Sequence, residues 1–131
     1  MKCKELMIGD YVDVGADGCP PAVAVVEEIY GKANRALLSI CKSSVTFDAK
    51  DISPIKLTEE FFLKNGYTEL YRDNHVTRLY NRNYIGLRVN IYPPENYVRF
   101  RVDGIDINYV HEFQHYLRLV NLSDYANNLK I

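Results

Sequence analysis

The chain has 131 residues, enough for one domain or for two very small subdomains that share a core. Hydrophobic residues make up 47% of it and charged residues 25%, values that are ordinary for a globular protein and exclude wholesale disorder. The formal net charge of −1 gives no overall field that would draw the chain to nucleic acid or to an anionic membrane. The 11 tyrosines, against no tryptophan, suit half-exposed sheet faces and contact surfaces.

The cysteines indicate the compartment. Cys3, Cys19 and Cys41 are an odd number without the spacing of metal ligands, which favours a reducing environment. No apolar run has the length of a signal peptide or of a membrane-spanning helix. We therefore expect a soluble, cytoplasmic protein that does not associate with a membrane.

The first part of the chain is predicted to be a small β-barrel. Short apolar runs separated by turn residues predict strands at residues 5–14, 22–30, 37–41 and 45–48. The Gly9-Asp10 step indicates a bend or bulge in the first strand. Strands this short and closely spaced favour a barrel of Src-homology-3-like size over residues 1–54.

Residues 55–131 are predicted to form a helix, an antiparallel meander and a C-terminal helix, which makes the expected fold class α+β. Thr58 is a favourable N-cap for the first helix, and Asn65-Gly66 is a stop signal. Alternating apolar residues predict a hairpin, and Asp103-Gly104 predicts a tight turn after it. The strands are expected at 76–80, 85–91, 98–102 and 105–107, and the last helix at 109–120, followed by a polar tail.

One motif suggests metal chemistry. His111-Glu112-Phe113-Gln114-His115 on a helix sets two histidines one turn apart, where both can bind one zinc ion. Glu112 would then act as the general base on a zinc-bound water. A zinc-dependent hydrolase is therefore one candidate function, with His111 and His115 as metal ligands.

Two features of the sequence weigh against this metal site. Val110, Phe113 and Leu117 form the apolar stripe of the helix, so that His111 and His115 point about 170° away from its centre and are expected to face water. The extended zinc motif also needs a third ligand, but position 118 is arginine and position 121 is asparagine. We therefore expect no metal, no cofactor and no catalytic residue, and we expect Asp10 to be an ordinary solvated turn residue.

The polar face of the predicted hairpin is a candidate binding surface. With a four-residue loop at 93–96, Tyr92 would lie opposite Tyr97, Asn90 opposite Arg99 and Arg88 opposite Arg101. Facing arginines are unfavourable unless an acid or an anionic ligand lies between them. Together with Tyr84 they would form an aromatic and basic face that can stack bases and hold phosphates, unless Asp106 or Glu112 neutralises it. The candidate binding residues are Tyr84, Arg88, Tyr92, Tyr97, Arg99 and Arg101.

Three segments carry a family resemblance. They are Leu6-Met7-Ile8-Gly9-Asp10-Tyr11-Val12, then Pro54-Ile55-Lys56-Leu57-Thr58-Glu59-Glu60, then Tyr109-Val110-His111-Glu112-Phe113-Gln114. In this order the chain resembles a family of short uncharacterised proteins of gut bacteria, often encoded beside phage or mobile-element genes. In the family pattern His111 and Gln114 recur but a histidine at 115 does not. The resemblance implies no catalytic residues and lowers the expectation of zinc.

The sequence therefore favours a non-enzymatic binding or adaptor module for protein or nucleic acid. A protein partner or self-association is expected more than nucleic acid. The zinc-dependent hydrolase stays as the alternative.

Overall fold

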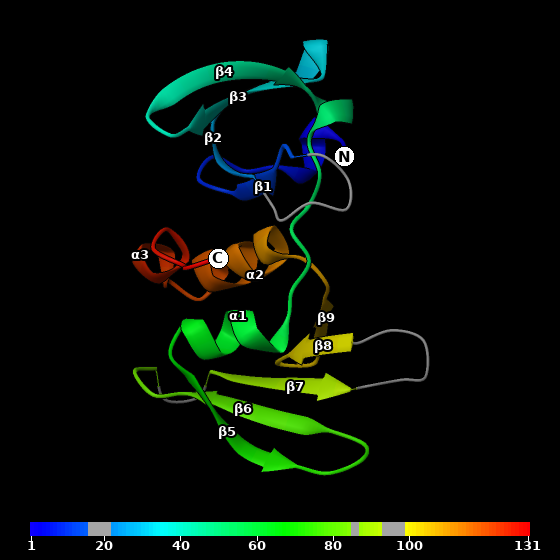
Figure 1. Cartoon of the computed structure of the whole chain (residues 1–131), viewed down its shortest axis with the longest axis vertical. Helices are drawn as coiled ribbons and strands as arrows, with labels where there is room; N and C mark the ends of the chain where they lie inside the picture. The colour runs from blue at the N-terminus through cyan, green and yellow to red at the C-terminus, as the bar shows by residue number, and fades with distance from the viewer. Residues whose placement is uncertain (16–21, 85–86, 93–98) are drawn as a thin grey trace. The chain divides into compact units, whose positions relative to one another are not determined.

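The structure of the chain is a computed structural model that describes residues 1–15, 22–84, 87–92 and 99–131 (Figure 1). Its internal contacts divide it into two units. The first contains Met1–Lys56 and Tyr109–Asn128, and the second contains Leu57–Asn108 and Leu129–Ile131. The division at 54 and 55 that the sequence indicated stays a prediction, since contacts do not test whether either part folds alone.

The first unit is built on a four-stranded antiparallel sheet whose strand order follows the sequence. Two of its neighbouring strands, β3 and β4, are joined by Cys41 and Lys42, which have φ values of 47° and 70°. Positive φ at both central residues is what a tight type I′ hairpin turn requires. The strands are β1 (Tyr11–Asp13), β2 (Val23–Tyr30), β3 (Arg35–Ile40) and β4 (Ser43–Asp48), and the 3-10 helices are η1 (Cys3–Glu5), η2 (Gly31–Ala33) and η3 (Ala49–Asp51).

Alternation along these strands produces the core of the first sheet. Apolar residues at every second position are buried on one face, which is why the strand positions could be predicted. Phe47 of β4 packs at the margin of this core. The buried cluster contains Leu6, Val12, Ala24, Val26, Ala36, Leu38 and Ile52.

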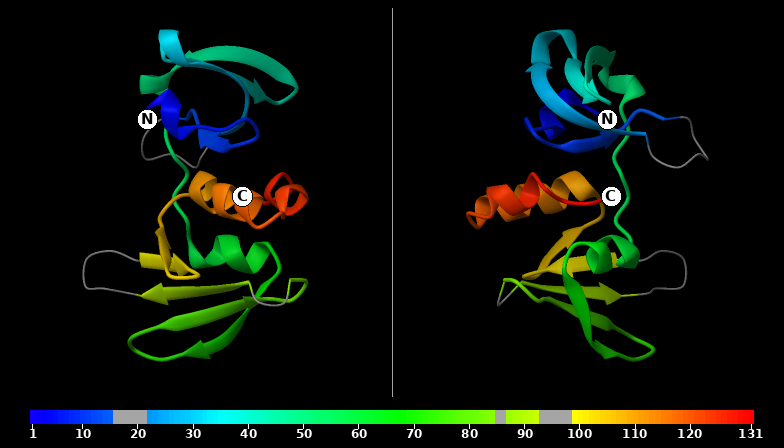
Figure 2. Two further views of the ribbon diagram at one scale, coloured as in Figure 1. Left: turned by 180° about the vertical axis from the view of Figure 1, so that it is seen from behind. Right: turned by 60° about the vertical axis from the view of Figure 1, so that its left-hand side comes forward.

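The predicted α+β fold with a closed barrel of Src-homology-3-like size is wrong. The described chain is mostly two antiparallel sheets with few helices, and within it β1 and β4 are separate edges of the first sheet (Figure 2). The outer edge of β1 is already occupied, because Asp13 and Ser53 exchange two backbone hydrogen bonds of 2.8 Å. The side chain of Gln114, from helix α2 (Val110–Leu119), bonds to Gly9 and Tyr11 on the same edge, so β4 cannot pair there to close the sheet.

Helices α2 (Val110–Leu119) and α3 (Ser123–Ala126) complete the first unit. The chain enters α2 beside the segment that follows the sheet, where the amide of Val110 donates to the carbonyl of Ile55 over 2.9 Å. Glu112 accepts a 3.1 Å hydrogen bond from the amide of Tyr109, which satisfies an otherwise unpaired donor at the helix start. The C-terminal helix is thus confirmed, while the short α3 lies where a polar tail was predicted.

The second unit is a five-stranded antiparallel meander with one helix, α1 (Glu59–Lys64). Thr58 caps the helix as predicted, because its hydroxyl accepts from the amide of Phe61 over 3.1 Å. Phe62 packs edge-on against Tyr67 with ring centroids 5.3 Å apart, and it also contacts Phe100 of the sheet. The strands are β5 (Tyr67–Arg72), β6 (Thr77–Asn81), β7 (Arg88–Tyr92), β8 (Arg99–Val102) and β9 (Ile105–Ile107).

The hairpin of β7 and β8 has a different register from the predicted one. Tyr92 lies opposite Arg99, and Asn90 lies opposite Arg101, so the connection between the strands is two residues longer than expected. The place opposite Arg101 is thus taken by Asn90 and not by Arg88, whose neighbour on the other side of β7 is Tyr80 of β6. The facing arginines that the sequence predicted therefore do not occur. The turn at Asp103-Gly104 is confirmed, with φ values of 47° and 78°.

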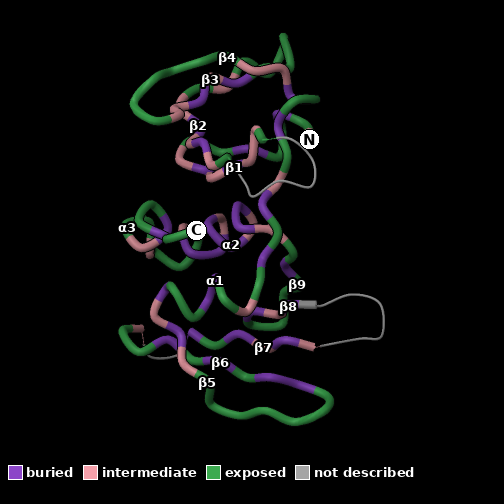
Figure 3. The backbone as a smooth tube through the Cα atoms, in the orientation of Figure 1, coloured by how far each residue is buried: buried purple, intermediate pink, exposed green. Residues whose placement is uncertain are grey.

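Burial along the chain follows these sheets (Figure 3). In the second unit, β6 has the strict alternation of a strand with one covered face, whereas most of β5 is exposed. None of the helices in the described ranges is long and apolar enough to cross a membrane.

Candidate functional site

The His-Glu motif does not face water as the sequence analysis expected. His111 is only 6% exposed, and Gln114 of the same helix is fully buried. Val110, Phe113 and Leu117 are buried too, so α2 is covered on more than its apolar stripe. A helical wheel identifies the apolar face of a helix. Polar side chains on another face can also be buried if other parts of the chain supply hydrogen-bonding partners for them, and the wheel does not reveal this.

The partners are the backbone and side chains around Gly9-Asp10-Tyr11. Oε1 of Gln114 accepts a 2.8 Å hydrogen bond from the amide of Tyr11, and Nε2 donates to the carbonyls of Gly9 and Ala126 over 3.0 Å each. The amide side chain therefore acts on the outer edge of β1 as a neighbouring strand would, supplying one acceptor and one donor.

Asp10 is the centre of a buried ion-pair network. It is fully buried, where the sequence analysis expected a solvated turn residue. Oδ2 accepts from the amide of Met7 and from Nε2 of His115, both over 2.8 Å, and Oδ1 accepts from Nη1 of Arg118 over 2.7 Å. A buried carboxylate needs such partners, because its desolvation would otherwise be very costly. We call Asp10, Gln114, His115 and Arg118 the anchor network, since they hold α2 against the start of β1.

The anchor network determines what His115 can do. An ionised carboxylate only accepts hydrogen bonds, so Nε2 of His115 carries the proton that it shares with Asp10. Binding a metal through this nitrogen would break the bond to Asp10. Nε2 of His115 is therefore committed to the anchor network, which leaves Nδ1 as the ring nitrogen that a metal ion could bind.

His111 has no such partner. Its ring stacks on Tyr109 with centroids 5.8 Å apart, and it meets the ring of His115 edge-on at 5.6 Å. Nδ1 of His111 is buried and has no hydrogen-bond partner in the described structure. Burial lowers the pKa of His111, and the carboxylate of Asp10 only partly offsets this effect. The imidazole is therefore neutral near pH 7, with an unsatisfied ring nitrogen.

A hollow of about 600 Å³ in the first unit opens at His111. We call it the histidine pocket. Two carboxylates, Glu5 and Glu112, contribute to its wall, and no lysine or arginine side chain is among its described lining residues. The lining residues are Met1, Glu5, Pro54, Tyr109, His111, Glu112 and His115.

The geometry does not assemble a metal centre from the motif. Although the two rings are close enough to share an ion, no group of three or more His, Cys, Asp or Glu residues in the described ranges could hold one. A catalytic zinc site requires three protein ligands and an open position. The motif offers His111 and His115, and the described residues supply no third ligand beside them, so they do not fit that requirement.

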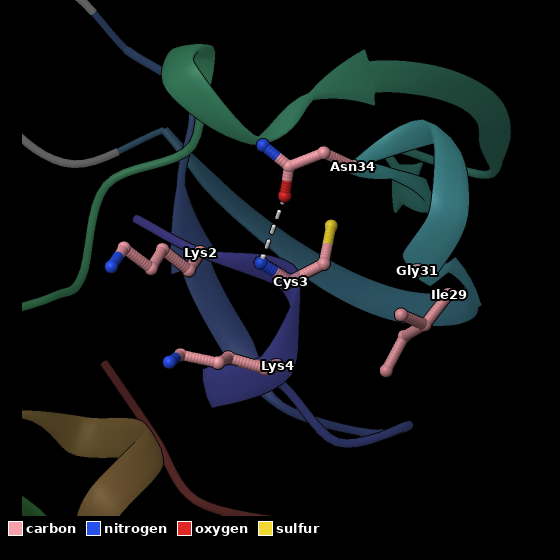
Figure 4. A pocket seen from close by; sticks show the side chains of 6 residues that line it. All are labelled: Lys2, Cys3, Lys4, Ile29, Gly31 and Asn34. Atoms are coloured by element: carbon pink, nitrogen blue, oxygen red, sulfur yellow. Dashed lines mark hydrogen bonds between the residues drawn. The ribbon is translucent and has the colours of Figure 1, made fainter.

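A second hollow, of about 420 Å³, lies beside η1 and η2 (Figure 4). The amide of Cys3 donates to Oδ1 of Asn34 over 3.3 Å, and its thiol donates to the carbonyl of Arg35. Burial raises the pKa of the Cys3 thiol, which keeps it protonated and unreactive. The side chains of Lys2 and Lys4 point away from the thiol (Figure 4). This hollow therefore has no nucleophile.

The predicted basic face of the hairpin is only partly assembled. Arg88 is exposed on β7, while Arg101 forms a 2.9 Å ion pair with Asp106 of β9. Tyr84 and Tyr92 are half-buried. Arg99 lies on β8, but its side chain is outside the described residues, as is Tyr97. Asp106 is thus the neutralising acid at Arg101.

Comparison of the chain with protein-family models, with curated proteins and with solved structures found no match. The resemblance to proteins of gut bacteria and mobile elements therefore stays a prediction. The function has to be argued from the two features on which the structure centres, the anchor network and the histidine pocket.

Proposed function

We propose that the protein is a non-enzymatic binding module that takes a basic side chain of a protein partner into the histidine pocket. The observation that carries this proposal is the hollow itself, where the neutral imidazole of His111 lies in the wall beside two carboxylates, Glu5 and Glu112, with no lysine or arginine among the described lining residues.

The chemistry of the pocket favours a guanidinium group. Glu5 and Glu112 attract a cation, and the neutral imidazole of His111 accepts a hydrogen bond from it. A guanidinium carries five donors in a plane and stacks on aromatic rings such as that of Tyr109. An arginine side chain therefore satisfies the acid, acceptor and aromatic groups of the wall together.

A test uses N-acetyl-arginine amide as the probe and N-acetyl-citrulline amide, which has nearly the same shape without the charge, as the control. Saturable shifts of the His111 and Tyr109 NMR signals with the arginine probe, much weaker with citrulline, would support the proposal. Glu5→Gln together with Glu112→Gln should abolish the difference between the responses to the two probes. The cap of α2 should be kept, because a glutamine at residue 112 can also accept the hydrogen bond from the amide of Tyr109. Equal responses to the two probes would refute it.

The nucleic-acid version of the binding module is less favoured. Asp106 already neutralises Arg101, and the register removes the facing arginines. Salt-dependent binding of single-stranded DNA or RNA that is lost in Arg88→Ala/Arg99→Ala/Arg101→Ala would favour it instead. Unchanged binding in that variant would exclude the hairpin face as a nucleic-acid site.

The zinc-dependent hydrolase remains the alternative from another class, with His111 and His115 as ligands and Glu112 as base. It requires a third ligand that the described residues do not supply, with Nδ1 of His115 on the metal while Nε2 keeps its bond to Asp10. We also propose a cytoplasmic location, supported by the free thiols of Cys3 and Cys41. Cys19 lies outside the described residues. An association with phage or mobile elements rests on the sequence resemblance alone.

A further inference from the structure

The two edge strands of the first sheet differ in whether their outward-facing backbone groups have partners. On β1, Gln114 bonds to the carbonyl of Gly9 and the amide of Tyr11, and Ser53 bonds to the amide and carbonyl of Asp13. On β4, no strand in the described part of the chain pairs with the outer side. The sheet therefore ends in one occupied edge and one open edge.

Most of the open edge lacks the usual protections, since the one charged residue of β4, Asp48, lies at the end of the strand. Exposed edge strands normally carry a charge, a proline or a bulge that prevents pairing with another chain. The segment from Ser43 to Phe47 contains no charged residue and no proline, and β3 and β4 pair over six consecutive residues without a register shift. Residues 43–46 are all exposed.

The outward-facing groups of β4 can be assigned. The amide of Ala49 donates to the carbonyl of Asn34 over 2.9 Å, so residue 49 bonds toward β3. Hydrogen-bonded and non-bonded positions alternate along an antiparallel pair. Phe47, Val45 and Ser43 therefore bond toward β3, and the amides and carbonyls of Ser44, Thr46 and Asp48 face outward.

Val45 adds an apolar contact at the centre of this edge. It lies opposite Leu38, which is fully buried, so its side chain is on the core face of the sheet. Yet Val45 is 45% exposed, because the sheet does not close over it. A further strand beside β4 would cover this side chain.

We propose that β4 pairs with β4 of a second copy of the chain, antiparallel and with the two-fold axis at Val45. In this register Ser44 lies opposite Thr46 of the partner copy, so that outward groups meet outward groups at both ends. Val45 lies opposite Val45 of the partner copy. Lys42, in the turn before β4, comes beside Asp48 of the partner copy, where it joins the ion pair that Asp48 already forms with Arg35 of its own chain, and this contact is formed twice.

The sequence of β4 and of the turn before it favours this register over the neighbouring ones. Moving the axis by one residue to Thr46 or to Ser44 keeps the outward groups matched but separates Lys42 from Asp48 and Val45 from its counterpart. A partner of unrelated sequence would have no reason to match both ends. The pairing of β4 does not depend on the histidine pocket, so refuting either proposal would leave the other unaffected.

The first test is the mass of the full chain by sedimentation equilibrium across a wide concentration range. A monomer–dimer equilibrium is expected. Ser44→Lys/Thr46→Lys sets like charges opposite each other on the solvent face and should give a monomer, and Ser44→Glu/Thr46→Glu should do the same. An equimolar mixture of the two variants should recover a dimer. A wild-type monomer at millimolar concentration, or variants that dimerise as well as the wild type, would overturn the proposal.

The second test reads the register. In a background with Cys19→Ser and Cys41→Ser, Val45→Cys should form a disulfide between copies under mild oxidation, because the two thiols meet at a close non-hydrogen-bonded pair. Thr46→Cys is the matched control, since its counterpart is displaced by two residues along the strand and should cross-link poorly. Equal cross-linking at both positions, or none at Val45→Cys, would contradict the proposed pairing.

Discussion

The carboxylate of Asp10 and Nε2 of His115, 105 positions apart in the chain, lie 2.8 Å from each other in a partly buried contact of the first unit. Arg118, the last residue but one of α2, holds the other oxygen of the same carboxylate. The helix that carries the His-Glu motif is therefore fixed to the start of β1 by charge as well as by Gln114.

Replacing Asp10 should be costly. Asp10→Asn leaves His115 and Arg118 without their anion, and breaking a largely buried pair in this way costs about 3 kcal/mol. Asp13→Asn is the control, because the oxygen that binds the amides of Gly15 and Ala22 is retained in asparagine. Urea unfolding of the three proteins measures the difference. Equal losses for Asp10→Asn and Asp13→Asn would show that the anchor network does not stabilise the fold.

Gln114 should protect the edge of β1 from solvent. Gln114→Met keeps the size of the side chain but leaves the amide of Tyr11 without its acceptor. Hydrogen exchange at Tyr11 should become about tenfold faster, which corresponds to about 1.4 kcal/mol. The amide of Asp13, which donates to Ser53, is the internal control and should change less. Equal acceleration at both amides would indicate global destabilisation instead of a local role.

The stability of the first unit should depend on pH through His111. Burial lowers its pKa in the folded state below the usual 6.5, so the unfolded chain binds the proton more tightly. Stability from this residue is therefore fully present above about pH 6.5 and is lost as the pH falls below it. The urea midpoint should drop between pH 7 and pH 5, and His111→Phe should reduce the drop while His75→Phe, at an exposed position, should not. An unchanged slope in His111→Phe would contradict this assignment.

The turn between β8 and β9 should require its glycine. Gly104 has a φ of 78° and no neighbour within 4 Å of an added Cβ, so Gly104→Ala is penalised by backbone strain alone. The expected loss is about 1–2 kcal/mol. Gly31→Ala is the matched control, since that position is equally open and its φ is not in the left-handed region. Thermal unfolding should show no loss for Gly31→Ala, and a similar loss for both variants would rule out strain as the cause.

Local signals in the sequence predicted the elements but not their assembly. The Thr58 cap, the Asp103-Gly104 turn and the alternation in β7 each depend on a few neighbouring residues, and each was placed close to its observed position. The closed barrel was wrong because β1 is capped by Ser53 and Gln114, and Gln114 comes from a helix about 100 residues away. Nothing in a strand's own sequence reports which distant group occupies its edge.

For the candidate site, too, the sequence predicted the local motif but not its surroundings. The motif at 111–115 was recognised, but the apolar stripe of the helix suggested that its histidines face water. A usable signal was present in the polar residues at 114, 115 and 118, which share one side of a helix and include an amide, an imidazole and a guanidinium. Such a set on one face predicts a buried acidic partner, and in the structure that partner is Asp10. The hairpin register was missed because the length of its connection could not be read from the sequence.

We propose that the His-Glu motif belongs to a binding module and does not form a zinc centre. This proposal is tested most directly by elemental mass spectrometry of the full chain, purified without a histidine tag or chelator and then dialysed against zinc. We expect substoichiometric zinc in the wild type and no change in His115→Ala, because the described residues supply no third ligand beside His111 and His115. Stoichiometric zinc that is lost in His115→Ala would contradict the claim and make the hydrolase the leading function.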